Sequence, residues 1–179
     1  SSTDLETIYG NIHEEFNKLK NYIFCNEGDI IIDAGAYIGS SSIILSIIFP
    51  NAKIICLEPS KENFSLLKKN LKGKKNFVLI NKALTIPSSK KKISFLFDKT
   101  NQWGGSLLNK DFKEKKITRY NVYSISLKQI YLKYKLNKKN LKIIKLDIEG
   151  YEKILFEKEK KNLNYFKLIF VELHDNIIK

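Results

Sequence analysis

The stretch Ile30-Ile31-Ile32-Asp33-Ala34-Gly35-Ala36-Tyr37-Ile38-Gly39 decides the fold of this chain. Three consecutive β-branched residues without alternation predict a strand that is buried on both faces. Two glycines follow, and Ser40-Ser41-Ser42 then begins an apolar run with helical spacing. This order is typical of a nucleotide site, because Gly35 can adopt a positive φ and the first N–H groups of a helix are free to bind ligand atoms. An ordinary strand–turn–helix packing site fits the same residues.

The composition indicates one globular domain. The chain has 179 residues, 43% of them hydrophobic, which is enough for one compact core. No apolar run approaches the roughly 18 residues of a membrane span, and the first residues lack a basic-then-apolar signal peptide. The two cysteines, Cys25 and Cys56, lie outside any C-x-x-C pattern or zinc spacing. We therefore expect a reduced, cytoplasmic protein without a metal site, whose oligomeric state the sequence leaves open.

The net charge of +13 raises the question of an acidic partner. All basic residues except Arg119 are lysines, whereas recognition of phosphates and base edges favours arginine. Lys, Asn and Ile are abundant together, as codon usage in an AT-rich genome would produce. The charge therefore favours a solvated basic surface, with nucleic acid or an anionic glycan as the alternative partner.

Helix and strand patterns alternate along the first half of the chain. Apolar residues recur at three- and four-residue steps over residues 3–24, which predicts an amphipathic helix. We expect residues 1–27 to cover the substrate side of a main domain formed by residues 28–179. Two more strands are expected at 53–58 and 77–80, each after a helix. The order β-α-β-α-β predicts an α/β protein with a Rossmann-like, mostly parallel central sheet flanked by helices.

The second half contains further strand patterns and one long polar segment. Strands are expected at 92–97, 120–125, 141–147 and 166–173. Residues 98–118 include Trp103 and Ser106 and predict a long loop, which is often a lid or a binding segment.

Polar side chains end five of the predicted strands, where ligands of open α/β sheets bind. They are Asp33, Glu58, Asn81, Asp147 with Glu149, and Glu172 with His174. Glu58 can accept hydrogen bonds from both hydroxyls of a ribose, as in NAD sites, or can be a surface residue. Asp147 and Glu149 can favour a cation, orient a hydroxyl or hold a metal, or they can be a helix N-terminal acid pair. His174 can take a proton from an attacking hydroxyl.

Taken together, these motifs resemble the FkbM family of S-adenosylmethionine (SAM)-dependent methyltransferases. The resemblance covers about residues 28–174. The matching motifs are Asp33-Ala-Gly35-Ala36-x-x-Gly39-x-x-Ser42, Glu58-Pro59 with Asn63-Phe64 and Asn70, Ala83-Leu84, Gly104-Gly105-Ser106-Leu107, Lys145-Leu146-Asp147-Ile148-Glu149-Gly150-Tyr151-Glu152 and Val171-Glu172-Leu173-His174. Family members are, or are predicted to be, O-methyltransferases that act on hydroxyls of sugars, glycans and other natural products.

The resemblance implies a class I methyltransferase fold and a role for each matched residue. The cofactor would contact Asp33, Gly35, Ala36, Tyr37 and Gly39 on its methionine side, Glu58 at the ribose, Asn81 and Ala83 near the adenine, and Asp147 at the sulfonium. Acceptor contacts are expected from Trp103, Ser106, Glu149 and Glu172. The resemblance does not settle the base, for which His174 and Asp147 are the candidates. The family usually has Asn where this chain has Tyr37, so contacts near the methionine part are expected to differ.

The sequence thus predicts a SAM-dependent O-methyltransferase in which the acceptor hydroxyl attacks the sulfonium methyl in line. Alignment in a dry site would supply most of the catalysis. The alternatives are an RNA- or anionic-glycan-directed methyltransferase docked by the lysines, and a non-catalytic module that binds SAM. A nicotinamide dehydrogenase is disfavoured because the loop lacks G-x-G-x-x-G. Methyltransferase sheets usually continue beyond the position of His174, so this chain is a compact member, is cut short, or completes its sheet with residues 92–125.

Overall fold

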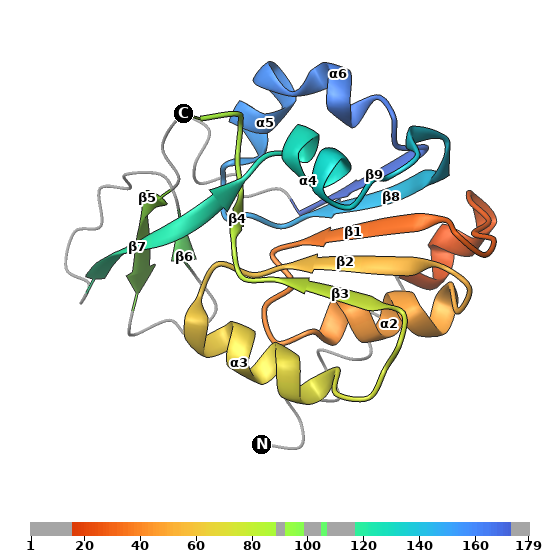
Figure 1. Ribbon diagram of the computed structural model, residues 1–179, viewed down its shortest axis with the longest axis horizontal. Helices are drawn as coiled ribbons and strands as arrows, with labels where there is room; N and C mark the ends of the chain where they lie inside the picture. Colours follow the sequence, from red (N-terminus) through yellow and green to blue (C-terminus); the bar gives the residue numbers. More distant parts are fainter. Residues whose placement is uncertain (1–15, 89–91, 99–104, 107–116, 173–179) are drawn as a thin grey trace.

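The computed structural model describes residues 16–88, 92–98, 105–106 and 117–172. Its centre is a five-stranded sheet in the order β3-β2-β1-β8-β9, in which every neighbouring pair is parallel (Figure 1). The strands are β1 (Ile30–Ala34), β2 (Lys53–Leu57), β3 (Phe77–Ile80), β8 (Leu141–Leu146) and β9 (Leu168–Val171). The predicted α/β class with a mostly parallel central sheet is confirmed.

The middle of the sheet is buried on both faces, as the uninterrupted β-branched run predicts. Every residue of β1 is buried, and Ile31 and Ile32 are fully inaccessible. Ile32 packs into the core on one face of the sheet, and Ile31 packs into the core on the other. Cys56 on β2 is buried too, and that burial raises the pKa of its thiol, as expected of an inert cysteine.

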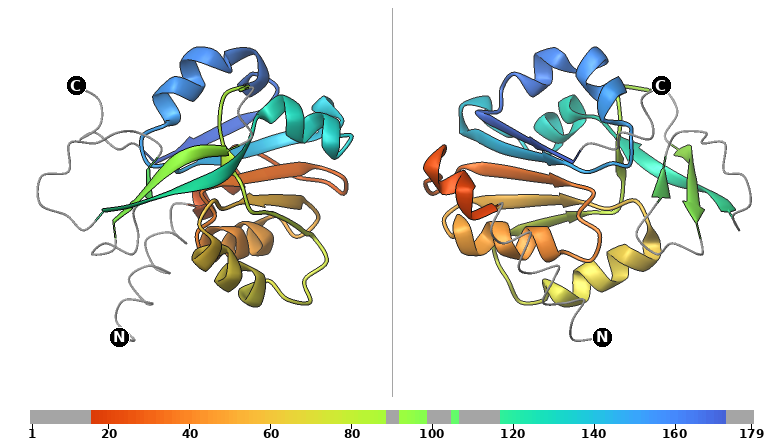
Figure 2. Two further views of the ribbon diagram at one scale, coloured as in Figure 1. Left: turned by 60° about the vertical axis from the view of Figure 1, so that its left-hand side comes forward. Right: turned by 180° about the vertical axis from the view of Figure 1, so that it is seen from behind.

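Helices cover both faces of the sheet (Figure 2). On one face lie α2 (Ser40–Ile48) and α3 (Lys61–Asn70), and on the other lie α4 (Leu127–Lys133), α5 (Glu152–Lys158) and α6 (Lys160–Leu163). Two helices begin with side-chain caps: Ser60 accepts from the Asn63 N–H at the start of α3, and Ser126 forms a capping box with Gln129 at the start of α4.

Only the end of the expected N-terminal helix lies within the described residues. Phe16 and Leu19 are buried in the same core as α2, and the ring of Phe16 lies 4.8 Å from that of Phe170 on β9. A short 3₁₀ turn, η1 (Leu19–Asn21), then leads toward β1. The position of residues 1–15, and with it the substrate-side cover, lies outside the described residues.

A second sheet follows β3 and stands at the carboxyl ends of the central strands (Figure 1). Its order is β4-β7-β5-β6, formed by β4 (Ala83–Leu84), β7 (Ile117–Ile125), β5 (Lys92–Asp98) and β6 (Gly105–Ser106). The prediction of one loop over residues 98–118 was wrong in part, because Gly105–Ser106 pairs with β5 and β7 begins at Ile117. The strands β5, β6 and β7 therefore build a separate sheet with β4 and do not extend the central one.

Candidate active site

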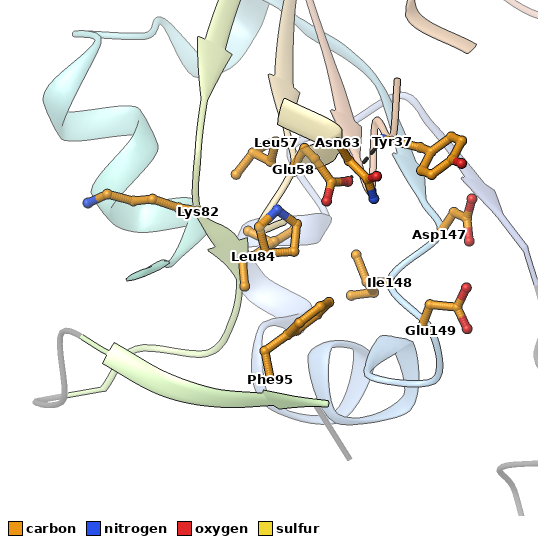
Figure 3. A pocket seen from close by; sticks show the side chains of 13 residues that line it. Tyr37, Leu57, Glu58, Asn63, Lys82, Leu84, Phe95, Asp147, Ile148 and Glu149 are labelled. Carbon is orange, nitrogen blue, oxygen red and sulfur yellow. Dashed lines mark hydrogen bonds between the residues drawn. The ribbon is translucent and has the colours of Figure 1, made fainter. Parts of the chain in front are cut away.

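A pocket lies where the order of the central strands reverses. The chain leaves β1 toward β2 and β3 on one side and returns to β8 on the other, so the loops after β1 and β8 diverge. The pocket between them has a volume of about 610 Å³, a value that includes space open to solvent. Figure 3 shows the side chains that line it. Its lining residues are Gly35, Tyr37, Leu57, Glu58, Pro59, Asn63, Lys82, Ala83, Leu84, Phe95, Asp147, Ile148 and Glu149.

The two diverging loops are held together through their backbones. The N–H groups of Gly35 and Ala36 both donate to the carbonyl of Leu57, at 3.0 and 2.9 Å, and the Asp147 N–H donates to Ala34 at 3.1 Å. Gly35 has a φ of +80°, and a Cβ atom there would overlap the carbonyl oxygen of Asp147. The chain therefore requires glycine at position 35 for its own packing, before any ligand is considered.

Glu58 brings a buried carboxylate to the pocket at the end of β2. It is only 5% exposed, and its two oxygens accept from the backbone N–H of Tyr37 at 3.0 Å and of Ser60 at 2.8 Å. Burial raises the pKa of Glu58 to about 7, although both N–H donors oppose the shift. Because each carboxylate oxygen has two lone pairs, Glu58 keeps acceptor capacity for ligand hydroxyls.

Asp33 lies beneath the glycine loop. Its side chain is fully buried, and its Oδ2 accepts from Ser41 Oγ at 2.7 Å and Ser42 Oγ at 2.6 Å. Its Oδ1 lies 3.6 Å from Lys145 Nζ. Asp33 is not among the residues that line the pocket, so it supports the loop and the first turn of α2 from below. Its contact with a cofactor stays a prediction.

Lys145 is a buried cation beside the pocket residue Asp147, and the sequence reasoning did not single it out. It is 6% exposed, and its Nζ lies 3.0 Å from Asp147 Oδ2 and 3.5 Å from the Gly35 carbonyl. Burial by itself lowers the pKa of Lys145, but Asp33 and Asp147 outweigh it and the net shift is upward. The signal was a lysine inside the buried strand LKIIKL, directly opposite Asp33 in the sheet register.

The loop after β8 brings two more carboxylates to the pocket. Asp147 and Glu149 both line it, and Glu149 has a φ of +57°, rare for a residue other than glycine. The buried carboxylate of Glu152 fixes this loop by accepting from the Ile148 N–H at 2.7 Å. Glu152 was also missed, because its position at a helix start is common for surface acids.

The opposite wall of the pocket is apolar. Ala83, Leu84 and Phe95 line it from the second sheet. Asn81, predicted near the adenine, is not a lining residue; its amide donates to the carbonyls of Glu58 at 2.8 Å and Pro59 at 3.1 Å. Asn81 therefore shapes the loop that carries Glu58. Phe95 was missed because its alternating strand gives no indication of where the second sheet docks.

The remaining predicted site residues lie near the pocket's lining or outside the described residues. Ala36 is buried, and Gly39 begins α2 with a φ of +98°. Glu172 is exposed, and its N–H donates to Leu146 at 2.9 Å. Ser106 is placed by its backbone only, in β6 beside Leu96. Trp103 and His174 lie outside the described residues.

Two further observations concern the described part of the chain. No group of three or more His, Cys, Asp or Glu side chains there is arranged to hold a metal ion. None of the helices found there has the length and apolar character needed to cross a bilayer.

The parallel sheet, its strand order and the carboxylate-lined pocket at its switch point define a Rossmann-like, class I methyltransferase fold. The family model described as Methyltransferase FkbM domain matches residues 33–178. The chain therefore belongs to the FkbM methyltransferase family, as its motifs predicted. None of the curated proteins matches it.

Several solved structures are similar to parts of the chain. A precorrin-6y C5,15-methyltransferase from Geobacter metallireducens GS-15 is 26% identical, with 37% of this chain and 35% of that one covered and a TM-score of 0.32. An rRNA methylase from Streptococcus thermophilus is 19% identical, with 40% and 42% covered and a TM-score of 0.34. A fibrillarin/Nop5p complex is 17% identical, with 81% and 50% covered and a TM-score of 0.43. The chain thus spans half or less of the length of each of these structures.

Proposed function

We propose that this chain is a SAM-dependent O-methyltransferase that acts on a hydroxyl of a sugar, a glycan or a related natural product. The observation that carries the proposal is Glu58, a buried carboxylate that faces the pocket from the end of β2. A carboxylate at this position is suited to accept hydrogen bonds from the two hydroxyls of a ribose.

The residues around the pocket fit the chemistry of SAM from one end to the other. Leu84 and Phe95 offer an apolar surface to an adenine ring, and Glu58 lies between that surface and the glycine loop (Figure 3). Asp147 and Glu149 lie across the pocket from the apolar wall. Asp147 would stabilise a cationic sulfonium, and Glu149 would contact the acceptor. Gly35 and Tyr37 would line the methionine part.

The reaction needs an electrophilic methyl group, which the sulfonium of SAM supplies when it is bound. The residues of this chain would contribute position and charge. Lys145 fixes the Asp147 carboxylate through a 3.0 Å hydrogen bond, and Glu152 fixes the loop that bears it. The apolar wall would exclude water from the reacting atoms. Asp147 or His174 would remove the proton of the acceptor hydroxyl.

The charge around the pocket favours an acceptor without phosphates. In the described loops at the carboxyl ends of the central strands, the acids Glu58, Asp147, Glu149 and Glu172 stand against one lysine, Lys82. A polyanion approaching these loops would meet more acidic than basic side chains. We therefore place an RNA- or anionic-glycan-directed activity second to a neutral hydroxyl acceptor.

The proposal is tested by calorimetric titration of the chain with SAM, S-adenosylhomocysteine and NAD. Binding of the first two and not of NAD is expected, and the reverse would exclude the cofactor assignment. A panel of sugar and glycan acceptors then tests the reaction, with a short RNA in parallel. Methyl transfer to RNA alone would overturn the acceptor class, and binding of SAM without transfer to any hydroxyl would indicate a non-catalytic module.

A further inference from the structure

In the described part of the chain, the loops at the two edges of the central sheet differ in charge. Five loops lead into its strands, and we count them as residues 22–29, 49–53, 71–76, 134–142 and 164–167, which include the first residues of β2 and β8; together they form what we call the amino edge. These loops contain nine lysines and only two acids, Glu27 and Asp29. The pocket opens at the opposite, carboxyl edge, where acids predominate in the described loops. Among the described loops at the two edges of the central sheet, the lysines therefore gather on the side that faces away from the pocket.

The positive charge of the amino edge faces solvent. Eight of the nine lysines are exposed. The ninth, Lys142, lies 3.4 Å from the carboxylate of Asp29, which is only 6% exposed. One of the two acids is thus already paired and buried, so it adds little negative charge to the surface. Lysines near the carboxyl ends of helices are stabilised by the helix dipole. The lysines in loops 71–76 and 164–167 lie beyond the helices, so the dipole does not explain them.

The same edge carries unusually exposed apolar side chains. Tyr22 and Phe24, in the loop before β1, are 77% and 79% exposed. Ile47 and Leu132 are 64% and 69% exposed in the last turns of α2 and α4, which both end at this edge. Of the seven strongly exposed large hydrophobic side chains in the described part, four therefore lie here.

A hydrogen bond joins the aromatic loop to the most basic one. Asn140 Nδ2 donates to the carbonyl of Gly28 at 3.0 Å, which connects loop 22–29 with loop 134–142. Both loops are also bonded to neighbouring chain segments, since the carbonyl of Asp29 accepts from the Lys53 N–H at 2.8 Å and the carbonyl of Lys142 accepts from the Lys167 N–H at 2.9 Å. The lysines and the exposed aromatic residues thus belong to one fixed surface.

We propose that the amino edge is a docking surface for an anionic lipid bilayer. Lysines near such a surface strengthen binding by about fivefold each, and aromatic side chains partition into the interface between lipid and water. Aliphatic side chains such as Ile47 and Leu132 gain from that interface but cannot stack on nucleobases. Arginine, which nucleic-acid recognition favours, is absent from the amino-edge loops. A chain docked in this way presents its pocket to the solution.

The test is co-sedimentation of the full chain with phosphatidylcholine vesicles that contain or lack phosphatidylglycerol, at low and at moderate salt. Binding is expected only with the anionic lipid and should weaken as salt rises. The double variant Lys74→Gln/Lys75→Gln should bind roughly twentyfold more weakly. Phe24→Ala should weaken binding at both salt concentrations, because its contribution is apolar.

Matched control variants remove two lysines or one apolar side chain from parts of the chain outside the amino edge. Lys61→Gln/Lys153→Gln takes two exposed lysines from α3 and α5, and Leu66→Ala takes an exposed apolar side chain from α3. Both controls should keep the vesicle affinity. Calorimetry with SAM on every variant keeps this test separate from the proposed function, because the amino-edge variants should leave that titration unchanged.

Three results would overturn the proposal. The first is no sedimentation with anionic vesicles at low salt. The second is an equal loss of affinity in the edge variants and in their controls. The third is binding of a short RNA that is tighter than vesicle binding, depends on Lys74 and Lys75 and ignores Phe24→Ala, which would assign the surface to nucleic acid.

Discussion

A side chain at position 35 would overlap the carbonyl oxygen of Asp147. The loops that follow β1 and β8 are therefore packed backbone against backbone, and this contact fixes one wall of the pocket. The two positions are more than a hundred residues apart in the sequence. Gly35 thus links the geometry of the glycine loop to that of the acidic loop after β8.

We expect Gly35→Ala to destabilise the chain by roughly 3 kcal/mol or more, because a positive φ and a backbone overlap both have to be relieved. Gly73→Ala is the matched control. Gly73 has nearly the same φ, +81°, but a Cβ atom there would meet nothing within 4 Å. The control should cost about 1 kcal/mol. Urea unfolding measures both values, and equal losses would refute the overlap.

Lys145 and Asp33 form a buried ion pair below the pocket, so the effects of mutating them on stability should depend strongly on one another. Lys145→Met should destabilise the chain by roughly 3–5 kcal/mol, because the fully buried Asp33 would lose its cation. Asp33→Asn removes the same attraction from the other side. The double variant should therefore lose much less than the sum of the single losses. A double-mutant cycle by urea unfolding gives the coupling, and additive losses would mean that the pair is not energetically linked.

Because the pKa of Glu58 is raised by burial, we expect the folded chain to become less stable as the pH rises. Burial raises the pKa of this carboxyl from the ordinary 4.5 to about 7 in the folded chain, so the folded state binds a proton more tightly. This contribution, on the order of 3 kcal/mol, is complete below about pH 4.5 and is lost as the pH rises to about 7. Glu58→Gln should flatten the profile of unfolding free energy over this range. Glu157→Gln, an exposed acid on α5, should leave the slope unchanged.

The titration of Glu58 should give the affinity for SAM the opposite pH dependence. Ribose hydroxyls need the ionised carboxylate as acceptor, so SAM affinity should rise as the pH increases through about 7. Calorimetry in buffers of different ionisation enthalpy should detect proton release on binding below this pH. In Glu58→Gln, SAM should bind more weakly and without this dependence. A wild-type affinity that is constant across pH 6 to 8 would exclude Glu58 as the ribose ligand.

The sequence was sufficient for the sheet and for part of the site. Uninterrupted apolar runs such as that of Ile30–Ile32 identify buried parallel strands, and the residues that follow them are brought to one edge by topology alone. Glu58 and Asp147 could be found in this way. Phe95 could not be placed, because the docking of the second sheet depends on tertiary packing.

Supporting residues were harder to identify than lining residues. Glu152 and Lys145 act through a hydrogen bond to a neighbouring loop or side chain, and each has an ordinary surface explanation in the sequence. Asp33 shows the converse: its motif position suggests a ligand contact, yet its side chain holds Ser41 and Ser42. Local sequence patterns thus locate a site but do not separate residues that face a ligand from those that support them.

Variants of the two candidate bases should differ in which step they impair. His174→Ala should lower kcat and leave the affinity for SAM intact, because a general base acts on the acceptor hydroxyl. Loss of such a base reduces rates by about 10²- to 10⁴-fold. Asp147→Asn keeps an oxygen for the hydrogen bond from Lys145 but removes a negative charge from the pocket. It should therefore weaken SAM binding more than S-adenosylhomocysteine binding, since only SAM carries the sulfonium charge.

Calorimetry with both ligands and single-turnover kinetics separate these effects. A fully active His174→Ala variant would remove His174 as the base and leave Asp147 as the candidate. Equal weakening of both ligands in Asp147→Asn would mean that the carboxylate shapes the loop after β8 and does not face the sulfonium. Glu149→Gln is the matched variant, because it neutralises a second carboxylate of the same loop that is expected to contact the acceptor. It should raise KM for the acceptor while the affinity for SAM stays unchanged.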